Sequence, residues 1–229
     1  MAETPTASSQ FTAFWLFARK DSWQDAVHPD WDQGVEQFAG VLAGVDPEVT
    51  VRGVYSCMGL RADVDLIIWV HAPRLDQLSQ LAVHLDQTLI GRSLRRVDGY
   101  IGTAGMSQYD PTHGPAFIKG LPARRYLSVY PFTKTPEWFL IHFEERRTMM
   151  IEHGKLGAAW PNLLTNTVES FGIQDQEFIV ALEDDDPKDI VDMVKKLRDA
   201  EVRIYTSVDT PIYLGERMST EDALATIRG

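Results

Sequence analysis

The apolar positions of the chain follow two spacings, one typical of buried strands and one typical of amphipathic helices. A continuous apolar run at 11–18 predicts a buried strand. In the segment that follows, Val35, Phe38, Ala39 and Leu42 recur at helical spacing. The chain is therefore predicted to begin with a strand and then a helix.

Two strands, a helix and a third strand are predicted next. Apolar, β-branched and aromatic residues dominate 50–60 and 62–73, which we interpret as strands. The helix at 74–91 ends at Gly91, a common residue at helix ends. Its apolar stripe consists of Leu75, Leu78, Leu81, Leu85 and Leu89. A closing strand at 99–105 completes the order β-α-β-β-α-β.

The second half of the chain repeats this order. Its predicted elements are a strand at 124–132, a helix at 136–153, strands at 163–173 and 176–184, a helix at 187–200 and a strand at 202–207. A shift of about 112 residues aligns the two halves strand for strand, which indicates a duplication. Because β-α-β-β-α-β is the ferredoxin-like order, the sequence predicts an α+β protein of two ferredoxin-like modules.

The predicted boundary between the modules follows residue 105. The N-terminal module then covers 1–105 and the C-terminal module covers 106–229. Two such modules can join their sheets into one dimeric α+β barrel, with helices outside and a cavity on the helix side of one half. A cavity in one half alone would explain why the halves have diverged.

Composition and charge narrow the class of partner. The chain has 229 residues, of which 44% are hydrophobic and 24% charged, close to the average of globular proteins. Its formal net charge of −11 opposes binding to nucleic acid or to anionic lipid, because like charges repel. We expect no nucleic-acid partner and no membrane insertion, and an acidic ligand would need a locally basic site.

Cysteine usage and the N-terminal residues predict a cytoplasmic protein. The single cysteine, Cys57, excludes an internal disulfide and is expected to be a buried thiol. Residues 1–10 lack the basic start and apolar run of a secretory signal. No later segment has enough consecutive apolar residues to span a bilayer.

Two of the six histidines are candidates for chemistry. His153 is predicted in the last turn of its helix, on the side of Met149 and Met150, with Gly154 as the helix stop. There the imidazole could enter an apolar cavity, or it could simply be favoured by the helix dipole. His113 lies in a loop rich in proline and glycine, where binding residues are common, although a solvated loop histidine is the alternative.

The standard nucleotide-binding and hydrolase motifs are absent from the sequence. The acidic run at 183–187 is more typical of a strand-to-helix turn with an N-cap than of a metal site. The basic pairs at 124–125 and 146–147 could neutralise carboxylates, although arginines on amphipathic elements usually pair with nearby glutamates or face solvent.

Four segments together resemble the chlorite dismutase-like haem proteins, and within them the actinobacterial type of coproheme decarboxylase. The segments are SVYPFTKTPEWF, EERRTMMIEHG, TNTVESFGIQDQEFIVALE and DTPIYLGERM. The resemblance covers nearly the whole chain and is clearest in its C-terminal half. It implies two ferredoxin-like modules per subunit, a homopentamer, and a porphyrin bound in the C-terminal module alone.

The resemblance also implies roles for individual residues. His153 would be the proximal iron ligand, with Met149 in the pocket wall. Tyr130 would be the catalytic tyrosine that takes hydrogen from a propionate. His113 would be the distal base that accepts a proton from hydrogen peroxide.

Further residues are expected to hold the substrate. Lys134 would bind a propionate as a point charge and Trp138 would pack beside the reacting edge. A solvated turn lysine and a core tryptophan are the alternatives. Arg217 and Ser219, near the C-terminus, are the candidates for holding the remaining propionates.

The chain departs from its relatives at one distal position. Chlorite dismutases carry an arginine thirteen residues after the proximal histidine, and Firmicute-type decarboxylases carry a glutamine, whereas this chain has Asn166 there. Without the arginine, chlorite decomposition would lack its usual electrostatic partner for the oxyanion. The departure therefore favours decarboxylation over chlorite decomposition. It also implies that His113 carries out more of the chemistry on the distal side.

The implied reaction is hydrogen peroxide-dependent oxidative decarboxylation of iron-coproporphyrin III (coproheme) to haem b, in which two propionates become vinyl groups. Coproheme would be both substrate and redox cofactor, and no other metal is expected. A transient contact with an upstream ferrochelatase is a further expectation. The alternatives are a haem-binding carrier or sensor without turnover, and a chlorite dismutase-like or general haem peroxidase.

Overall fold

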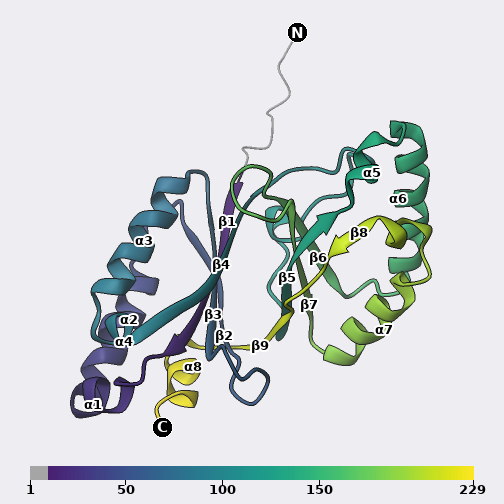
Figure 1. Cartoon of the computed structure of the whole chain (residues 1–229). Helices are drawn as coiled ribbons and strands as arrows, with labels where there is room; N and C mark the ends of the chain where they lie inside the picture. The colour runs from purple at the N-terminus through teal and green to yellow at the C-terminus, as the bar shows by residue number, and fades with distance from the viewer. Residues whose placement is uncertain (1–9) are drawn as a thin grey trace. The chain divides into compact units, whose positions relative to one another are not determined.

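The computed structural model describes residues 10–229, which divide into two compact units. Unit 1 contains the described chain up to Thr103 together with Leu214–Gly229, and unit 2 contains Ala104–Tyr213. Each unit combines helices with antiparallel strand pairs, which confirms the predicted α+β class. The helices and strands are labelled in Figure 1.

Unit 1 has the element order β-α-β-β-α-β, followed by a C-terminal strand and helix. Its strands are β1 (Gln10–Arg19), β2 (Thr50–Ser56), β3 (Leu66–Ala72), β4 (Leu94–Ala104) and β9 (Tyr213–Met218). Its helices are α1 (Trp23–Val27), η1 (His28–Asp30), α2 (Trp31–Ala43), α3 (Leu75–Gln87), α4 (Leu89–Ser93) and α8 (Thr220–Thr226). The strands lie side by side in the order β4-β1-β3-β2-β9.

The helices of unit 1 pack on one face of this sheet. Side chains alternate along β1, so that Ala13, Trp15 and Phe17 share one face. These residues join a single large apolar cluster with Phe38 of α2 and Leu78 of α3, both almost fully buried. Figure 1 shows α2, α3 and α4 on the same side of the strands. Burial of this face is the main source of stability in unit 1.

The C-terminal segment belongs to unit 1, not to the predicted module 106–229. The segment is held there because β9 pairs with β2 and because Ala223, Leu224 and Ile227 are fully buried in the cluster of unit 1. At the other end, unit 2 begins at Ala104, two residues before the predicted boundary.

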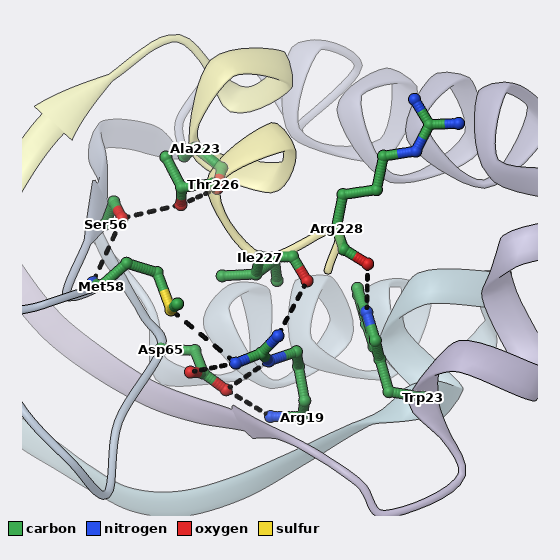
Figure 2. A network of polar contacts seen from close by, with 9 residues as sticks. All are labelled: Arg19, Trp23, Ser56, Met58, Asp65, Ala223, Thr226, Ile227 and Arg228. Atoms are coloured by element: carbon green, nitrogen blue, oxygen red, sulfur yellow. Dashed lines mark hydrogen bonds and ion pairs between the residues drawn. The ribbon is translucent and has the colours of Figure 1, made fainter.

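Polar contacts also fix the C-terminal segment (Figure 2). Arg19, at the end of β1, donates to Asp65 from its backbone nitrogen at 2.7 Å and from Nε at 3.3 Å. Its Nη1 donates to the carbonyl of Ile227 at 3.4 Å. The hydroxyls of Ser56 and Thr226 lie 2.7 Å apart. These contacts tie α8 to strands that are distant in the sequence.

Unit 2 shows the same order of elements. Its strands are β5 (Tyr126–Lys134), β6 (Leu164–Glu169), β7 (Phe178–Asp184) and β8 (Thr206–Val208). Its helices are η2 (Phe117–Lys119), α5 (Pro136–Leu140), α6 (Phe143–Gly157), α7 (Pro187–Leu197) and η3 (Glu201–Tyr205). The strand order β6-β7-β5-β8 matches the order β2-β3-β1-β4 of unit 1, so the repeat seen in the sequence has a structural counterpart.

Two predicted helices are each divided in the structure. The helix predicted at 74–91 breaks at Thr88, whose extended backbone caps α4 and whose Oγ1 accepts from the Gly91 nitrogen at 2.9 Å. The helix predicted at 136–153 breaks at Ile141, which is extended, and at His142, whose backbone is also not helical. Its second part continues to Gly157, so the prediction that Gly154 ends the helix is wrong.

Other local predictions are confirmed or corrected. Cys57 is fully buried, as predicted. The acidic run at 183–187 forms the predicted turn, in which the Asp186 side chain accepts from the Lys188 nitrogen at 2.9 Å. The segment predicted as a strand at 202–207 is largely a 3₁₀ turn that buries Val202, and the strand that follows it, β8, is short and pairs with β5. Among residues 10–229, no helix combines the length and apolar character needed to cross a bilayer.

Candidate active site

Helix α6 of unit 2 has an inward face that is only partly buried. The helix spans 15 residues, and Met149 is its one buried residue. Arg146, Met150, His153 and Leu156 lie on the same side at helical spacing and are half-buried. By contrast, α3 of unit 1 buries four side chains over 13 residues. The face of α6 is thus packed less closely than a core helix face, as expected beside a ligand.

His153 lies in this face as a neutral imidazole. Its Nδ1 is buried and has no hydrogen-bond partner in the described part of the chain. Burial lowers the pKa of His153 to about 4, and the positive charge of Lys134 adds to that effect. Lys134, at the end of β5, lies over the Trp138 ring, which packs with Met149 of α6, so the inward face of α6 lies near the end of that strand. A neutral imidazole is the form that binds a metal.

Tyr130 and Lys134 come from the strand face that the helices cover. Tyr130 is opposite Val180 in β7, and both pack against the apolar cluster formed with α7. Burial, and next the negative charge of Asp209, raise the pKa of Tyr130 to about 12. The phenol therefore stays protonated at neutral pH.

Lys134 is an unusual lysine because it is 8% exposed. Its Nζ lies 4.5 Å from the ring centroid of Trp138 and 5.1 Å from that of Phe132. Burial lowers its pKa to about 8, helped by the charge of Arg203 and opposed by that of Glu177. The structure thus excludes the solvated turn lysine. Lys134 is therefore a cation largely shielded from water, and an anionic group beside it would be bound strongly.

Two arginines that the sequence analysis did not single out act on the same site. The charges of Arg198 and Arg203 both oppose the rise in the pKa of Tyr130. Both guanidinium groups bind Asp209, Arg198 at 2.7 Å and Arg203 at 3.2 Å. They lie in the segment that was predicted as a helix end and a strand, and no spacing signal marked them. Their position depends on the fold of the chain after α7.

Trp138 and Met149 form a small apolar cluster next to this group. Trp138 is 2% exposed and Met149 is 4% exposed, and both pack with Ala200 and Val202. The Trp138 ring also contacts Tyr205, with centroids 5.6 Å apart. The structure therefore places Trp138, Lys134 and Met149 next to one another, with His153 one turn further along the same face of α6.

His113 lies in an exposed loop of unit 2. Its backbone nitrogen donates to the Asp110 carbonyl at 2.9 Å, and its carbonyl accepts from the Ser107 nitrogen at 2.7 Å. The charge of His113 contributes to lowering the pKa of His153, after burial and Lys134.

Asn166 does not share the strand face of Tyr130. Along β6, Asn166 is opposite Ala181, whereas Thr167 is opposite Val180, the residue that faces Tyr130 in β5. Because side chains alternate between faces, Thr167 lies in the row of Tyr130 and Asn166 points to the other side of the sheet. Counting thirteen residues from His153 therefore selects a residue on the face opposite to that of Tyr130.

Arg217 and Ser219, the predicted partners of the remaining propionates, lie in unit 1. Arg217 is opposite Tyr55 of β2. Ser219 is the N-cap of α8, where its Oγ accepts from the Asp222 nitrogen at 3.0 Å and donates to the Asp222 carboxylate at 2.8 Å. That Arg217 and Ser219 hold the remaining propionates stays a prediction. Within unit 2, Arg198 and Arg203 are the cations beside Tyr130 and Lys134.

The residues of unit 2 fit an iron porphyrin. His153 offers a neutral imidazole, a ligand that haem iron commonly takes, beside an incompletely packed helix face. Phe132, Trp138 and Met149 supply apolar contacts, and Lys134 supplies a cation for an acidic edge. Among residues 10–229, no three side chains of the types His, Cys, Asp and Glu come together as a site for a free metal ion.

Comparisons with known proteins agree with this geometry. A family model described as chlorite dismutase matches residues 32–218. A coproheme decarboxylase from Mycolicibacterium smegmatis is 36% identical over 181 residues, which cover 79% of this chain and 78% of that protein. A protein of Halobacterium salinarum that is named as heme-binding is 28% identical over 91% of this chain. The match covers 47% of that protein, so the chain spans about half of its length.

The fold also matches solved structures. The structure of chlorite dismutase from Candidatus Nitrospira defluvii in complex with imidazole superimposes with a TM-score of 0.87. The match covers 99% of this chain and 97% of that one, at 22% sequence identity. At this identity the likeness shows the fold alone.

Proposed function

Because this chain belongs to the chlorite dismutase family, we propose that it converts coproheme to haem b with hydrogen peroxide, at the site between α6 and β5 of unit 2. The observation that carries the proposal is the half-packed inward face of α6, where Met149 packs with Trp138 and the Lys134 Nζ lies 4.5 Å from the Trp138 ring centroid. His153 lies on that face as a neutral imidazole, and Tyr130 lies on the same strand as Lys134 with its phenol protonated. A coproheme decarboxylase at 36% identity supports the choice of substrate.

In each of two rounds, one propionate, one hydrogen peroxide and one proton become a vinyl group, carbon dioxide and two waters. The propionate is oxidised by two electrons as its carboxylate leaves, and the peroxide is reduced. The bound iron porphyrin supplies this oxidising chemistry. The protein's contribution is to place the iron, the peroxide proton and the reacting propionate.

Each site residue then has one task. His153 would hold the iron through its neutral nitrogen, and His113 would accept a proton from the peroxide and return it to the water that is released. Tyr130 would give one hydrogen atom to the oxidant that the bound iron porphyrin supplies and take one from the β-carbon of the propionate, so its phenol must be protonated at rest. A pKa of about 12 keeps Tyr130 in that form. Lys134 and Arg203 hold carboxylates at the edge of the site.

The finer features of the fold belong to the same proposal. Each unit is a ferredoxin-like module, which the shared strand order supports. The two modules join in one barrel, the porphyrin is bound by unit 2 alone, and the subunits assemble as a homopentamer. Native mass spectrometry of the purified protein tests the pentamer, and a monomer or dimer would contradict it.

The deciding experiment compares Tyr130→Phe with Tyr126→Phe. Both tyrosines lie on β5 and on the same strand face, four residues apart. We expect both variants to bind coproheme with an unchanged Soret titration. Hydrogen peroxide should convert coproheme through a monovinyl intermediate to haem b in Tyr126→Phe, as in the unaltered protein, and yield no vinyl product in Tyr130→Phe. Liquid chromatography with mass spectrometry identifies the porphyrins.

Each of the other possible results would indicate a different function or would reject the site. Binding of coproheme without any vinyl product in the unaltered protein would indicate a haem carrier or sensor. Peroxidase or chlorite-degrading activity that survives Tyr130→Phe but not His153→Ala would indicate a general haem enzyme. Failure to bind coproheme would reject the site.

A further inference from the structure

The loop that carries His113 is attached to the sheet of unit 2 three residues later. The backbone nitrogen of Ala116 donates to the carbonyl of Thr165 at 3.2 Å. The backbone nitrogen of Phe117 donates to Oδ1 of Asn166 at 3.0 Å. Both acceptors belong to β6, so this strand fixes the end of the loop.

Asn166 makes this attachment from within the sheet. The residue is 1% exposed, and its Nδ2 donates to Oε1 of Glu183 at 3.0 Å and to the carbonyl of Ala181 at 3.2 Å. Glu183 is fully buried, and its Oε2 accepts from the Arg124 nitrogen at 3.1 Å. One buried amide and one buried carboxylate thus hold the chain at 117 and again at 124.

The attachment extends to His113 through a tight loop. The His113 carbonyl accepts from the Ser107 nitrogen at 2.7 Å, and Asp110 closes a turn with the Thr112 nitrogen at 2.9 Å. Lys119, shortly after Phe117 in the chain, donates from Nζ to the Thr112 carbonyl at 3.2 Å. Because few residues separate His113 from Ala116, the position of the His113 imidazole depends on where the segment at 116–117 is attached.

We propose that Asn166 is a positioning residue for His113, acting through the anchored segment at 116–117 and not by contact with substrate. The inference rests on the proposed function, because His113 is taken there as the distal base. Asparagine suits the place because a single amide accepts from Phe117 and donates to Glu183. Alanine would leave the buried Glu183 and the Phe117 nitrogen without those bonds, and aspartate would set a second carboxylate against Glu183.

The first test uses the protein without porphyrin. Hydrogen exchange in 105–121 is compared for Asn166→Ala, Asn166→Asp and the control Val168→Ala, which removes buried packing from the same strand face. We expect exchange at Ala116 and Phe117 to be about tenfold faster in Asn166→Ala, and to rise less in Asn166→Asp, which keeps the acceptor for Phe117. The isosteric aspartate also provides a result if the alanine variant does not fold. Exchange no faster than in Val168→Ala would overturn the proposal.

The second test is a double-mutant cycle on the peroxide-driven reaction. Asn166→Ala should slow vinyl formation about tenfold at saturating peroxide while leaving the Soret titration with coproheme unchanged. In a His113→Ala background the same substitution should have no further effect, because both act through one imidazole. Equal losses in both backgrounds would show a general structural role and overturn the inference. If no vinyl product forms in the unaltered protein, the proposed function fails, and the exchange test still decides whether Asn166 anchors the loop.

Discussion

At the scale of single residues, burial sets the protonation of the site. Burial favours the neutral form of any ionisable group, and so it lowers the pKa of His153 and Lys134 and raises that of Tyr130. The result is an imidazole that is neutral, a phenol that is protonated and a lysine that is close to its titration point, all under neutral conditions. No pattern in the sequence carries this information.

Under the proposed function, we expect Lys134 to make the binding of coproheme depend on pH. The lysine holds a carboxylate only when it is charged, and its pKa of about 8 means that the charge is present below that value and lost above it. The affinity for coproheme should therefore fall as the pH rises above about 8. In Lys134→Arg the charge persists, so the affinity should stay constant over the same range. Soret titrations between pH 7 and pH 10 measure this, and an identical decline in Lys134→Arg would contradict the assignment.

His153 makes the stability of the apoprotein depend on pH. Its pKa is about 4 in the folded state and rises to the ordinary value of 6.5 on unfolding. The unfolded state therefore binds more protons below pH 6.5, and stability is lost as the pH falls from 6.5 towards 4. At pH 5 the loss is about 2 kcal/mol in the free energy of unfolding.

Urea unfolding at pH 7.5 and pH 5 checks this value. In His153→Gln, the decrease in the free energy of unfolding between pH 7.5 and pH 5 should be smaller by about 2 kcal/mol. His71→Gln should show a similar reduction, because burial also lowers the pKa of His71, in unit 1, to about 4. An unchanged pH dependence in His153→Gln would show that the imidazole is not buried in the neutral form.

At the scale of elements, helices of similar length serve different purposes. Helix α3 buries a stripe that includes Leu78, Leu81 and Leu85, and its role is to complete the core of unit 1. Helix α6 buries Met149 alone and keeps Arg146 and His153 half-buried beside it. A helix that gives up packing on its inward face has room for a ligand there.

The break between α3 and α4 can be tested with two glycines. A Cβ at Gly91 would lie 1.8 Å from the Leu85 carbonyl oxygen, so Gly91→Ala should lower the free energy of unfolding by about 2 kcal/mol or more. A Cβ at Gly40, within α2, meets nothing within 4 Å. Gly40→Ala should raise stability by about 0.5 to 1 kcal/mol, because alanine favours the helix. Urea unfolding measures both, and a neutral Gly91→Ala would mean that the break is flexible.

At the scale of the whole molecule, the C-terminal segment of the chain folds as part of unit 1. The last strand pairs with β2, and α8 places Leu224 in the core of unit 1. Unit 2 is therefore inserted between two parts of unit 1. Folding of unit 1 consequently needs residues from both ends of the described chain.

Leu224→Ala tests this dependence. Leu224 is fully buried, so its truncation should lower the free energy of unfolding by about 2 to 5 kcal/mol. Hydrogen exchange should rise in β2 and β3, although both are more than a hundred residues away in sequence. Leu140→Ala is the control, because Leu140 is 85% exposed and its truncation should change stability by less than about 0.5 kcal/mol. Unchanged exchange in β2 and β3 would show that α8 is not part of this core.

The sequence by itself determined the order of elements, the α+β class and the family. Periodicity is a local property, so the strand in 62–73 and the helix around Leu78 and Leu81 could be predicted from spacing. The motifs around Tyr130 and His153 identified the family because they are contiguous in the chain.

The tertiary structure decided which distant residues meet. Strand register placed Thr167, and not Asn166, in the row of Tyr130, since a shift of one residue turns a side chain to the other face. The path of the chain after α7 brought Arg198 and Arg203 to Asp209, and pairing with β2 placed Arg217 in unit 1. The pKa values of the site also depend on burial. Register, long-range contact and burial are properties of the packed chain, and no spacing within the sequence encodes them.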